Sequence, residues 1–168
     1  MLLYSTSGYG YSKRLCTDIL QWFCAEYMPR HKIEIDVHHC GLVHDDSFGF
    51  CDVIDGFRRP REFKITLQAR MDKQNYTTTL LHELVHVHQW VSGRLTSKHR
   101  RMHYNGEEIN RDDYNNQPHE IDARKREHIL YSHFTGNPKY YSHFKNCHKM
   151  VVHVGLWVYN RCIPKGFT

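Results

Sequence analysis

The sequence has no apolar run that approaches the roughly 20 residues of a transmembrane helix. Its first ten residues, MLLYSTSGYG, lack the charged start and the long apolar centre of a signal peptide. Both absences predict a protein that has no membrane partner and stays in the cytoplasm of the cell that makes it.

Cysteine pairs of the CxxC type are also missing, although the chain has six cysteines. A zinc site built from four thiolates is therefore not expected, and without secretion the cysteines should be reduced. The hydrophobic share of 40% lies below the usual globular level of about 45–50%, which favours a folded protein with long polar loops. At 168 residues the chain should form a single domain.

Acidic residues are in the minority, since 23 Lys and Arg stand against 18 Asp and Glu and the formal net charge is +5. The excess is concentrated in three short clusters, RRPR at 58–61, KHRR at 98–101 and RKR at 124–126. Such clusters can bind nucleic acid or an acidic protein surface. Solvated loops and a helix face are the simpler interpretation of the same residues.

The first half of the chain predicts one helix followed by strands. Apolar residues recur at helical spacing across 11–28, and Pro29 follows where a helix should end. Segment 32–39 alternates apolar and polar residues with the period of a half-buried strand, and segment 61–68 does the same. Segment 48–55 is a weaker strand candidate.

The second half predicts two helices separated by a polar connection. The first runs from about residue 75 or 77 to Val91 and stops at Ser92-Gly93. The connection, 94–117, carries turn signals and is expected to be a long surface loop with at most a short strand. Pro118 begins the second helix, with Asn116 or Gln117 as its cap.

These elements predict an α+β fold with an N-terminal helix, a small mixed or mainly antiparallel sheet and two later helices. The segment MVVHVGLWVYN, at 150–160, is expected to be a strand or a buried segment. The rest of the chain after residue 132 carries no clear pattern.

The first of the two later helices contains the HExxH pattern, HELVH, in a chain with 15 histidines. His82 and His86 are four residues apart, so on a helix they lie about 40° apart and can hold one ion from the same face. Glu83 lies about 100° round from His82, where a general base for a zinc-bound water is needed. His88 lies about 200° from His86 and should point away. An apolar stripe on the opposite face would pack on the sheet: Leu80, Leu84, Val87 and Val91.

A catalytic zinc site needs three protein ligands and an open position. Glu120, in the first turn of the helix that begins at Pro118, is the leading candidate for the third ligand. Ala123 lies on the same face, and its small side chain would let the two helices approach closely. The rival candidates are His119, Asp122, His103, Asp112 and Asp113.

HELVHVHQW, the polar connection with HYNGEEI, and YNNQPHEIDARKRE together resemble the zincin-type metallopeptidases whose third ligand is a glutamate, the gluzincins. The pattern is most similar to zincin-like proteins from bacteriophage and other viral genomes, which share a helical HExxHxxQ and a later P-x-E-x-x-A. The resemblance spans 63–131, about two-fifths of the chain. It implies a minimal zincin-like fold, Zn²⁺ as the cofactor, His82, His86 and Glu120 as its ligands, and Glu83 as the general base. A viral origin would place the protein in the cytoplasm of an infected cell.

The implied activity is hydrolysis of peptide bonds in a peptide or protein substrate. Zinc would lower the pKa of its bound water to about 7 and polarise the substrate carbonyl, and Glu83 would pass the proton to the departing amine. Tyr114, Tyr104 and His103 are candidates for the group that stabilises the oxyanion. In zincin folds the substrate lies extended along an edge strand, and FKITLQ at 63–68 is a candidate for a strand near that edge, although the sequence does not fix its position in the sheet.

Two features differ from the better-known relatives. The NExxSD motif of thermolysin-like enzymes is absent, and so are the histidine third ligand and the cysteine-rich ribbon of SprT-like DNA-repair proteases. Two other functions therefore stay open. One is a nucleic-acid-associated protein or SprT-like protease that uses the basic clusters. The other is a structural zinc site closed by His119 or His103 as a fourth ligand.

Overall fold

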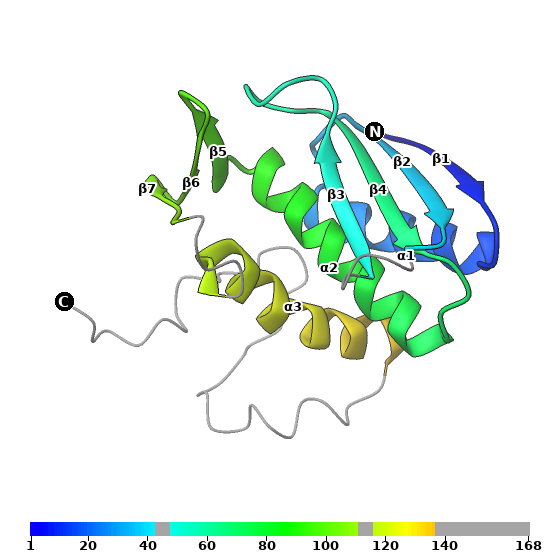
Figure 1. The fold of residues 1–168 in the computed structure, drawn as a ribbon. Coiled ribbons are helices and arrows are strands. Elements are labelled where there is room, and N and C mark those ends of the chain that lie inside the picture. The colour runs from blue at the N-terminus through cyan, green and yellow to red at the C-terminus, as the bar shows by residue number, and fades with distance from the viewer. Residues whose placement is uncertain (43–47, 111–115, 137–168) are drawn as a thin grey trace.

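The computed structural model describes residues 1–42, 48–110 and 116–136, which form two sheets and three helices. The larger sheet has four strands, in the order β1 (Leu2–Gly8), β2 (Ile33–Cys40), β4 (Glu62–Gln68) and β3 (Gly49–Val53). β1, β2 and β4 are parallel, and β3 pairs antiparallel with β4 at one edge (Figure 1). The fold is therefore α+β, with a mixed sheet.

Helices α1 (Lys13–Tyr27) and α2 (Lys73–Val91) cover the same face of this sheet. In β2 the side chains of Ile35 and Val37 are buried whereas Glu34 is exposed, as expected for a strand with one covered face. The buried strand residues join residues of both helices in one hydrophobic core. The helix predicted over 11–28 and the strands predicted over 32–39, 48–55 and 61–68 are all present.

Strand β1 is not predicted by the sequence pattern. β1, LLYSTSG, has only one neighbour in the sheet and is mostly exposed, so it lacks the apolar alternation of a half-buried strand. The segment FKITLQ belongs to β4, which lies between β2 and β3. The edge strand beside α2 is β3, so FKITLQ lies next to the edge, as expected.

The connection after α2 is not a loop but a three-stranded antiparallel sheet. Its strands are β5 (Leu95–Lys98), β6 (Arg101–Tyr104) and β7 (Glu107–Glu108). Each turn has two residues with positive φ, His99-Arg100 and Asn105-Gly106, which is the geometry of a tight hairpin. Asn105-Gly106 is a recognisable hairpin signal, whereas His99-Arg100 is not, which is why the sequence predicts a loop here.

Helix α3 (Pro118–Thr135) packs against α2 and ends at Gly136, whose φ of 65° is the left-handed conformation that glycine adopts readily. Gln117 is the cap residue, but its side chain makes no capping hydrogen bond. Ala123 is fully buried. None of the helices in the described segments is long and apolar enough to cross a membrane. Asp112, Asp113, Tyr114 and the segment 150–160 lie outside the described residues.

Candidate metal centre

Helix α2 presents its histidines on the side away from the sheet. The helix begins at Asp72, whose carboxylate accepts hydrogen bonds from the backbone N–H groups of Gln74 and Asn75, both at 2.9 Å. The predicted apolar stripe is buried in the core: Leu80, Leu84, Val87 and Val91. Because that stripe fixes the rotation of the helix, His82 and His86 face α3.

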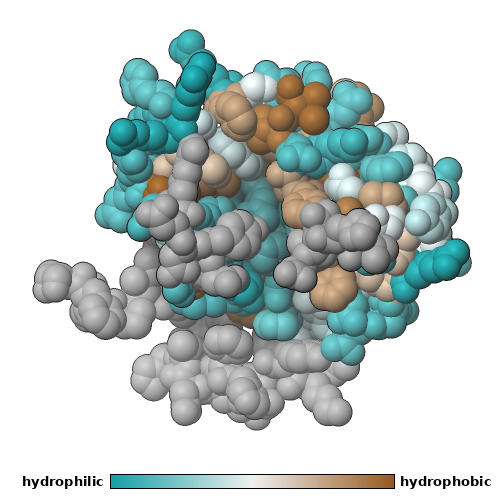
Figure 2. Space-filling model, in the orientation of Figure 1, coloured by the Kyte–Doolittle hydropathy of each residue, from teal (hydrophilic) through white to brown (hydrophobic). Residues whose placement is uncertain are grey.

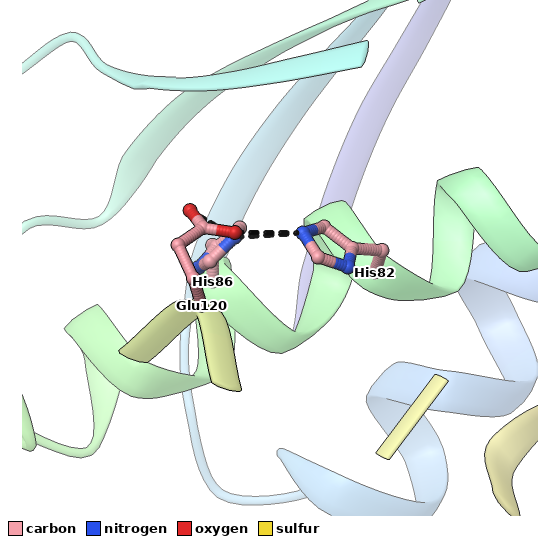
Figure 3. Close-up of side chains that lie close together, drawn as sticks. All are labelled: His82, His86 and Glu120. Atoms are coloured by element: carbon pink, nitrogen blue, oxygen red, sulfur yellow. Dashed lines mark hydrogen bonds and ion pairs between the residues drawn. The ribbon is translucent and has the colours of Figure 1, made fainter. Parts of the chain in front are cut away.

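Three side chains converge between α2 and α3. His82 and His86 come from α2 and Glu120 comes from the first turn of α3 (Figure 3). One ligand atom from each lies within 4.8 Å of the others. The Nε2 atoms of the two histidines are 3.1 Å apart, and the Glu120 oxygens lie 3.4 Å from His82 Nε2 and 3.3 Å from His86 Nε2.

These separations fit a metal ion. In a tetrahedral zinc site with bonds of about 2.0–2.1 Å, neighbouring ligand atoms lie about 3.3–3.4 Å apart. The Nδ1 atoms of both histidines are already used, His82 with Glu127 at 2.6 Å and His86 with Gln89 at 2.9 Å. Each ring therefore turns Nε2 towards the centre. Two imidazole nitrogens 3.1 Å apart need either a hydrogen, shared as an N–H···N hydrogen bond, or a metal ion between them.

The electrostatics of the group agree with a cation at this position. Burial alone would raise the pKa of Glu120, but the His82 and His86 rings in contact with its carboxylate hold it well below its usual value. Burial alone would lower the pKa of His82, yet the hydrogen bonds to Glu120 and Glu127 and the charge of Glu83 raise it to about 10. Without a metal, the group thus keeps a proton where a divalent cation would fit.

Glu83 lies beside the ligand group and against the edge strand. Its side chain is buried, and a Cβ atom added to Gly49 of β3 would lie only 3.0 Å from Glu83 Oε1. The missing side chain at position 49 thus leaves space for the carboxylate. Burial, together with the charges of Glu120 and Glu127, outweighs the two histidines and raises the pKa of Glu83. A carboxylate with a raised pKa is a stronger base.

The rival third ligands have other positions. Asp122 is buried and accepts a hydrogen bond from Gln89 Nε2 at 2.9 Å. His103 lies on β6 with Nδ1 3.1 Å from the carbonyl oxygen of Arg101. His119 is the nearest rival, because its Nε2 is 3.6 Å from Glu120 Oε1 and its ring centroid is 5.7 Å from that of His86. The group within 4.8 Å nevertheless contains Glu120 and not His119.

His88, predicted to point away, contacts a different part of α3. Its Nδ1 lies 3.3 Å from an Arg126 guanidinium nitrogen. Burial, followed by the charges of Arg126 and Arg94, lowers the pKa of His88 to about 4. His88 is therefore a neutral packing residue between the helices. Arg126, which belongs to the basic cluster 124–126, is buried as well.

Of the three proposed oxyanion donors, two are described. Tyr104 is buried on β6, where its hydroxyl accepts a hydrogen bond from the guanidinium group of Arg94. Burial, and then the nearby charge of Asp122, raises the pKa of Tyr104. His103 is half-buried on the same strand. Both residues come from the hairpin that flanks the C-terminal end of α2.

Sequence reasoning gave no role to Glu127, nor to Gln89, which is the last residue of the HExxHxxQ pattern. These two residues contact the outer nitrogens of the histidines. A signal for each was present. Glu127 lies seven residues after Glu120, two turns along the same face of a helix. Gln89 is three residues after His86, so the two side chains are neighbours on α2.

The chain was compared with protein-family models, with curated proteins and with solved structures, and none of them matches. The case for a function therefore comes from the chemistry of the site alone.

Proposed function

We propose that the protein is a zinc-dependent metallopeptidase of the zincin type, with His82, His86 and Glu120 as the zinc ligands. One observation carries the proposal. Two imidazole nitrogens and a carboxylate from two helices converge at separations of 3.1–3.4 Å, which suit a tetrahedral ion, beside the buried carboxylate of Glu83. Three protein ligands leave a fourth position for water or substrate.

Each residue then has a defined task. A bound zinc ion supplies Lewis acidity, which lowers the pKa of water and polarises a carbonyl group. Glu83 accepts a proton from the attacking water and donates it to the departing nitrogen. Its raised pKa suits both steps, since the group has to take up a proton and release it in one cycle. The side chain of His82 is 17% exposed, more than that of His86 or Glu120. A substrate would therefore reach the proposed zinc ion from the side of His82.

The edge strand β3 suits an extended peptide substrate. Every second residue of the β3 segment makes backbone hydrogen bonds to β4. Gln68 N–H donates to Phe48 O, and Ile54 N–H donates to Glu62 O. In an antiparallel pair the alternate residues, Cys51 and Val53, direct their backbone groups away from β4. A peptide can add to such an edge as a further strand. Because a Cβ atom added to Gly49 of the same strand would touch Glu83, the strand runs beside this residue, and the peptide would pass the proposed general base.

The surface around the site is hollowed and chemically mixed. Figure 2 shows hydrophilic residues over the β5–β6 hairpin and a hydrophobic group over the upper end of the large sheet, with the surface recessed between them. Exposed apolar residues of the β3–β4 connection include Ile54 and Phe57, and Phe57 packs against Trp90 of α2. A polypeptide in the recess would meet both surfaces.

The test compares zinc content and cleavage of fluorescein-labelled casein by the unaltered protein and by Glu83→Gln. We expect both to bind one zinc ion, and we expect the variant to lose cleavage by about 10²–10⁴-fold, the usual contribution of a general base. Glu34→Gln, on the exposed side of β2, is the matched control and should keep full activity. Retained cleavage by Glu83→Gln would contradict the mechanism, and no zinc in the unaltered protein would contradict the site.

A closed, structural zinc site is the second candidate, and His119 is the observation that favours it. His119 Nδ1 is buried without a hydrogen-bond partner among the described residues, while Nε2 faces Glu120 Oε1 at 3.6 Å. If the ring moved inward it could occupy the fourth position. A hydroxamate inhibitor separates the two candidates, because it coordinates zinc only where a position is open.

Nucleic-acid binding is a weaker candidate, because one arginine of the three basic clusters is buried and cannot reach a phosphate. Arg126 of the cluster 124–126 is buried beside Asp122, at 3.8 Å. Arg58, Arg59 and the hairpin turn 98–101 remain exposed. Titration with duplex and single-stranded DNA across a salt series tests this candidate, since binding through phosphates weakens steeply with salt.

A further inference from the structure

We propose that Asp122, which lies outside the ligand group, is a positioning residue for His86. In this arrangement Asp122 fixes the orientation of the Gln89 amide, and the amide fixes which nitrogen of His86 carries the proton. The position of that proton decides whether His86 can bind a metal. The inference rests on the proposed metal site but not on peptidase activity.

The first step is the orientation of Gln89. Its side chain is fully buried, and Nε2 donates hydrogen bonds to Asp122 Oδ2 at 2.9 Å and to the carbonyl oxygen of His119 at 3.0 Å. Both partners are pure acceptors, so the amide nitrogen has to face them. The amide oxygen is then left facing His86 Nδ1 at 2.9 Å.

The second step is the proton on His86. Because Gln89 Oε1 can only accept, His86 Nδ1 must be the donor. A neutral imidazole with its proton on Nδ1 has a lone pair on Nε2, which is the atom that faces His82 and Glu120. If the amide were reversed, Nε2 of Gln89 would face His86 and the proton would move to His86 Nε2. That tautomer cannot bind a metal through Nε2.

The third step is what holds Asp122 in place. Arg94, just before β5, has Nη1 3.3 Å from Asp122 Oδ2, and Arg126 on α3 has Nη1 3.8 Å from the same oxygen. Arg94 also donates to the Tyr104 hydroxyl on β6. The carboxylate is therefore fixed by the hairpin and by its own helix, and a reversed Gln89 would place two acceptors against each other. The network ties the β5–β6 hairpin to one metal ligand.

His82 provides an internal comparison. Its Nδ1 contacts the Glu127 carboxylate directly at 2.6 Å, without an intervening amide. Removal of the charge of Asp122 should therefore change which nitrogen of His86 carries the proton, and it should leave the contact between His82 and Glu127 intact. A general loss of folding would affect both rings.

The experiment uses the full chain with Asp122→Asn, in which a neutral amide accepts more weakly and offers N–H groups of its own to Gln89. Two quantities are measured: the ¹⁵N shifts of the His86 ring in the metal-free protein, and Zn²⁺ affinity by competition with a chromophoric chelator. We expect the Nδ1–H form of His86 in the unaltered protein, loss of that single form in the variant, and zinc affinity weakened by about 10–100-fold. Asp18→Asn, an exposed aspartate on α1, is the charge-matched control and should change neither quantity.

A double-mutant cycle separates the relay from a purely structural effect. Gln89→Met removes the amide but keeps a similar shape, so it should weaken zinc binding by itself. Once Gln89 is replaced, Asp122→Asn should cost little further affinity, because its influence passes through the amide. Full additivity of the two changes would overturn the proposal.

Two further outcomes also test the proposed role of Asp122. If Asp122→Asn does not fold, the unaltered protein suffices, because an Nε2–H form of His86 would exclude the relay. If the unaltered protein binds no zinc, the proposed function fails while the tautomer of His86 still tests the relay. The two failures are thus distinguishable.

Discussion

His82 and His86 present the same atom to the proposed metal centre but are held by different groups. Glu127 places a charged carboxylate on Nδ1 of His82, whereas Gln89 places a neutral amide on Nδ1 of His86. A carboxylate partner makes the imidazole a more basic ligand than an amide does. We therefore expect His82 to contribute more of the metal affinity than the similar geometry of the two rings suggests.

Replacement of Glu127 tests this difference. Glu127→Ala removes the 2.6 Å contact that orients the His82 ring, so zinc affinity should fall by about 10–100-fold. The measurement is chelator competition with the purified full chain. Glu108→Ala is the control, since it removes an exposed carboxylate that pairs with Arg101 and contacts none of the three proposed ligands. Equal affinities for the Glu127 variant and the unaltered protein would show that the contact is not functional.

At the scale of elements, the site depends on how closely α2 approaches β3. Gly49 permits that approach, because an added Cβ would lie 2.9 Å from Leu67 Cδ2 and 3.0 Å from both Glu83 Oε1 and Thr79 Cγ2. All three neighbouring atoms belong to side chains, so a methyl group could be accommodated by small shifts. One of those shifts would move the proposed general base.

Gly49→Ala should therefore lower turnover without loss of zinc. A displacement of a few tenths of an ångström at Glu83 should reduce kcat by about tenfold, given that misplacement by 1 Å can cost about 10²-fold. The measurement is casein cleavage together with zinc content. Glu34→Ala, on the exposed side of β2 and away from the proposed substrate edge, serves as the control. A variant with unchanged kcat would mean that Glu83 tolerates the shift or plays no part in the reaction.

The same elements show what sequence reasoning can and cannot predict. α1, α2, β2 and β4 each bury an apolar face, so the sequence shows the apolar periodicity of each element. β1 is an exposed edge strand, and the β5–β6 turn uses His99-Arg100 in place of glycine or asparagine, so neither carries a pattern. For α3, Pro118 and Ala123 predict the helix and its packing face.

Some residues of the site can be predicted from local sequence, whereas others depend on how the helices pack. Helix geometry alone predicts that His82 and His86 share a face, and the structure brings Glu120 to them. The choice between Glu120 and the adjacent His119 depends on the rotation of α3 against α2, which packing sets and which local sequence does not encode. Gln89 and Asp122 meet across the two helices for the same reason.

At the scale of the whole molecule, a buried histidine joins β1, β2 and α2. His39 is fully buried; Nδ1 lies 2.9 Å from the Ser7 carbonyl oxygen and Nε2 lies 3.0 Å from the Tyr76 hydroxyl. The ring also stacks on Tyr11 with centroids 3.6 Å apart. Since Nδ1 donates to Ser7 and Nε2 accepts from Tyr76, the neutral ring satisfies both contacts.

This histidine should make the fold sensitive to acid. Burial lowers the pKa of His39 below its usual value of 6.5, so the unfolded chain binds the proton more readily than the folded one. The stability that neutral His39 contributes is complete above pH 6.5 and is lost as the pH falls towards the folded pKa, by at most about 1.4 kcal/mol per pH unit. His39→Gln does not titrate, so the stability advantage of the unaltered protein should shrink between pH 7 and pH 5. Urea unfolding at each pH measures this, and parallel curves for the two proteins would exclude His39 as the cause.

Zinc itself should stabilise the whole fold, because its ligands come from two helices that no β-ladder joins. His82 and His86 lie on α2 and Glu120 lies on α3, so a bound ion cross-links the helices. At a zinc concentration 100 times the dissociation constant, the free energy of unfolding should rise by about 2.7 kcal/mol. For a chain of this size that corresponds to an increase in Tm of roughly 5–11 °C, which excess EDTA should reverse. Glu120→Ala should show little of this shift in thermal unfolding. An equal shift in both proteins would place the stabilising zinc elsewhere in the molecule and remove the main support for the proposed centre.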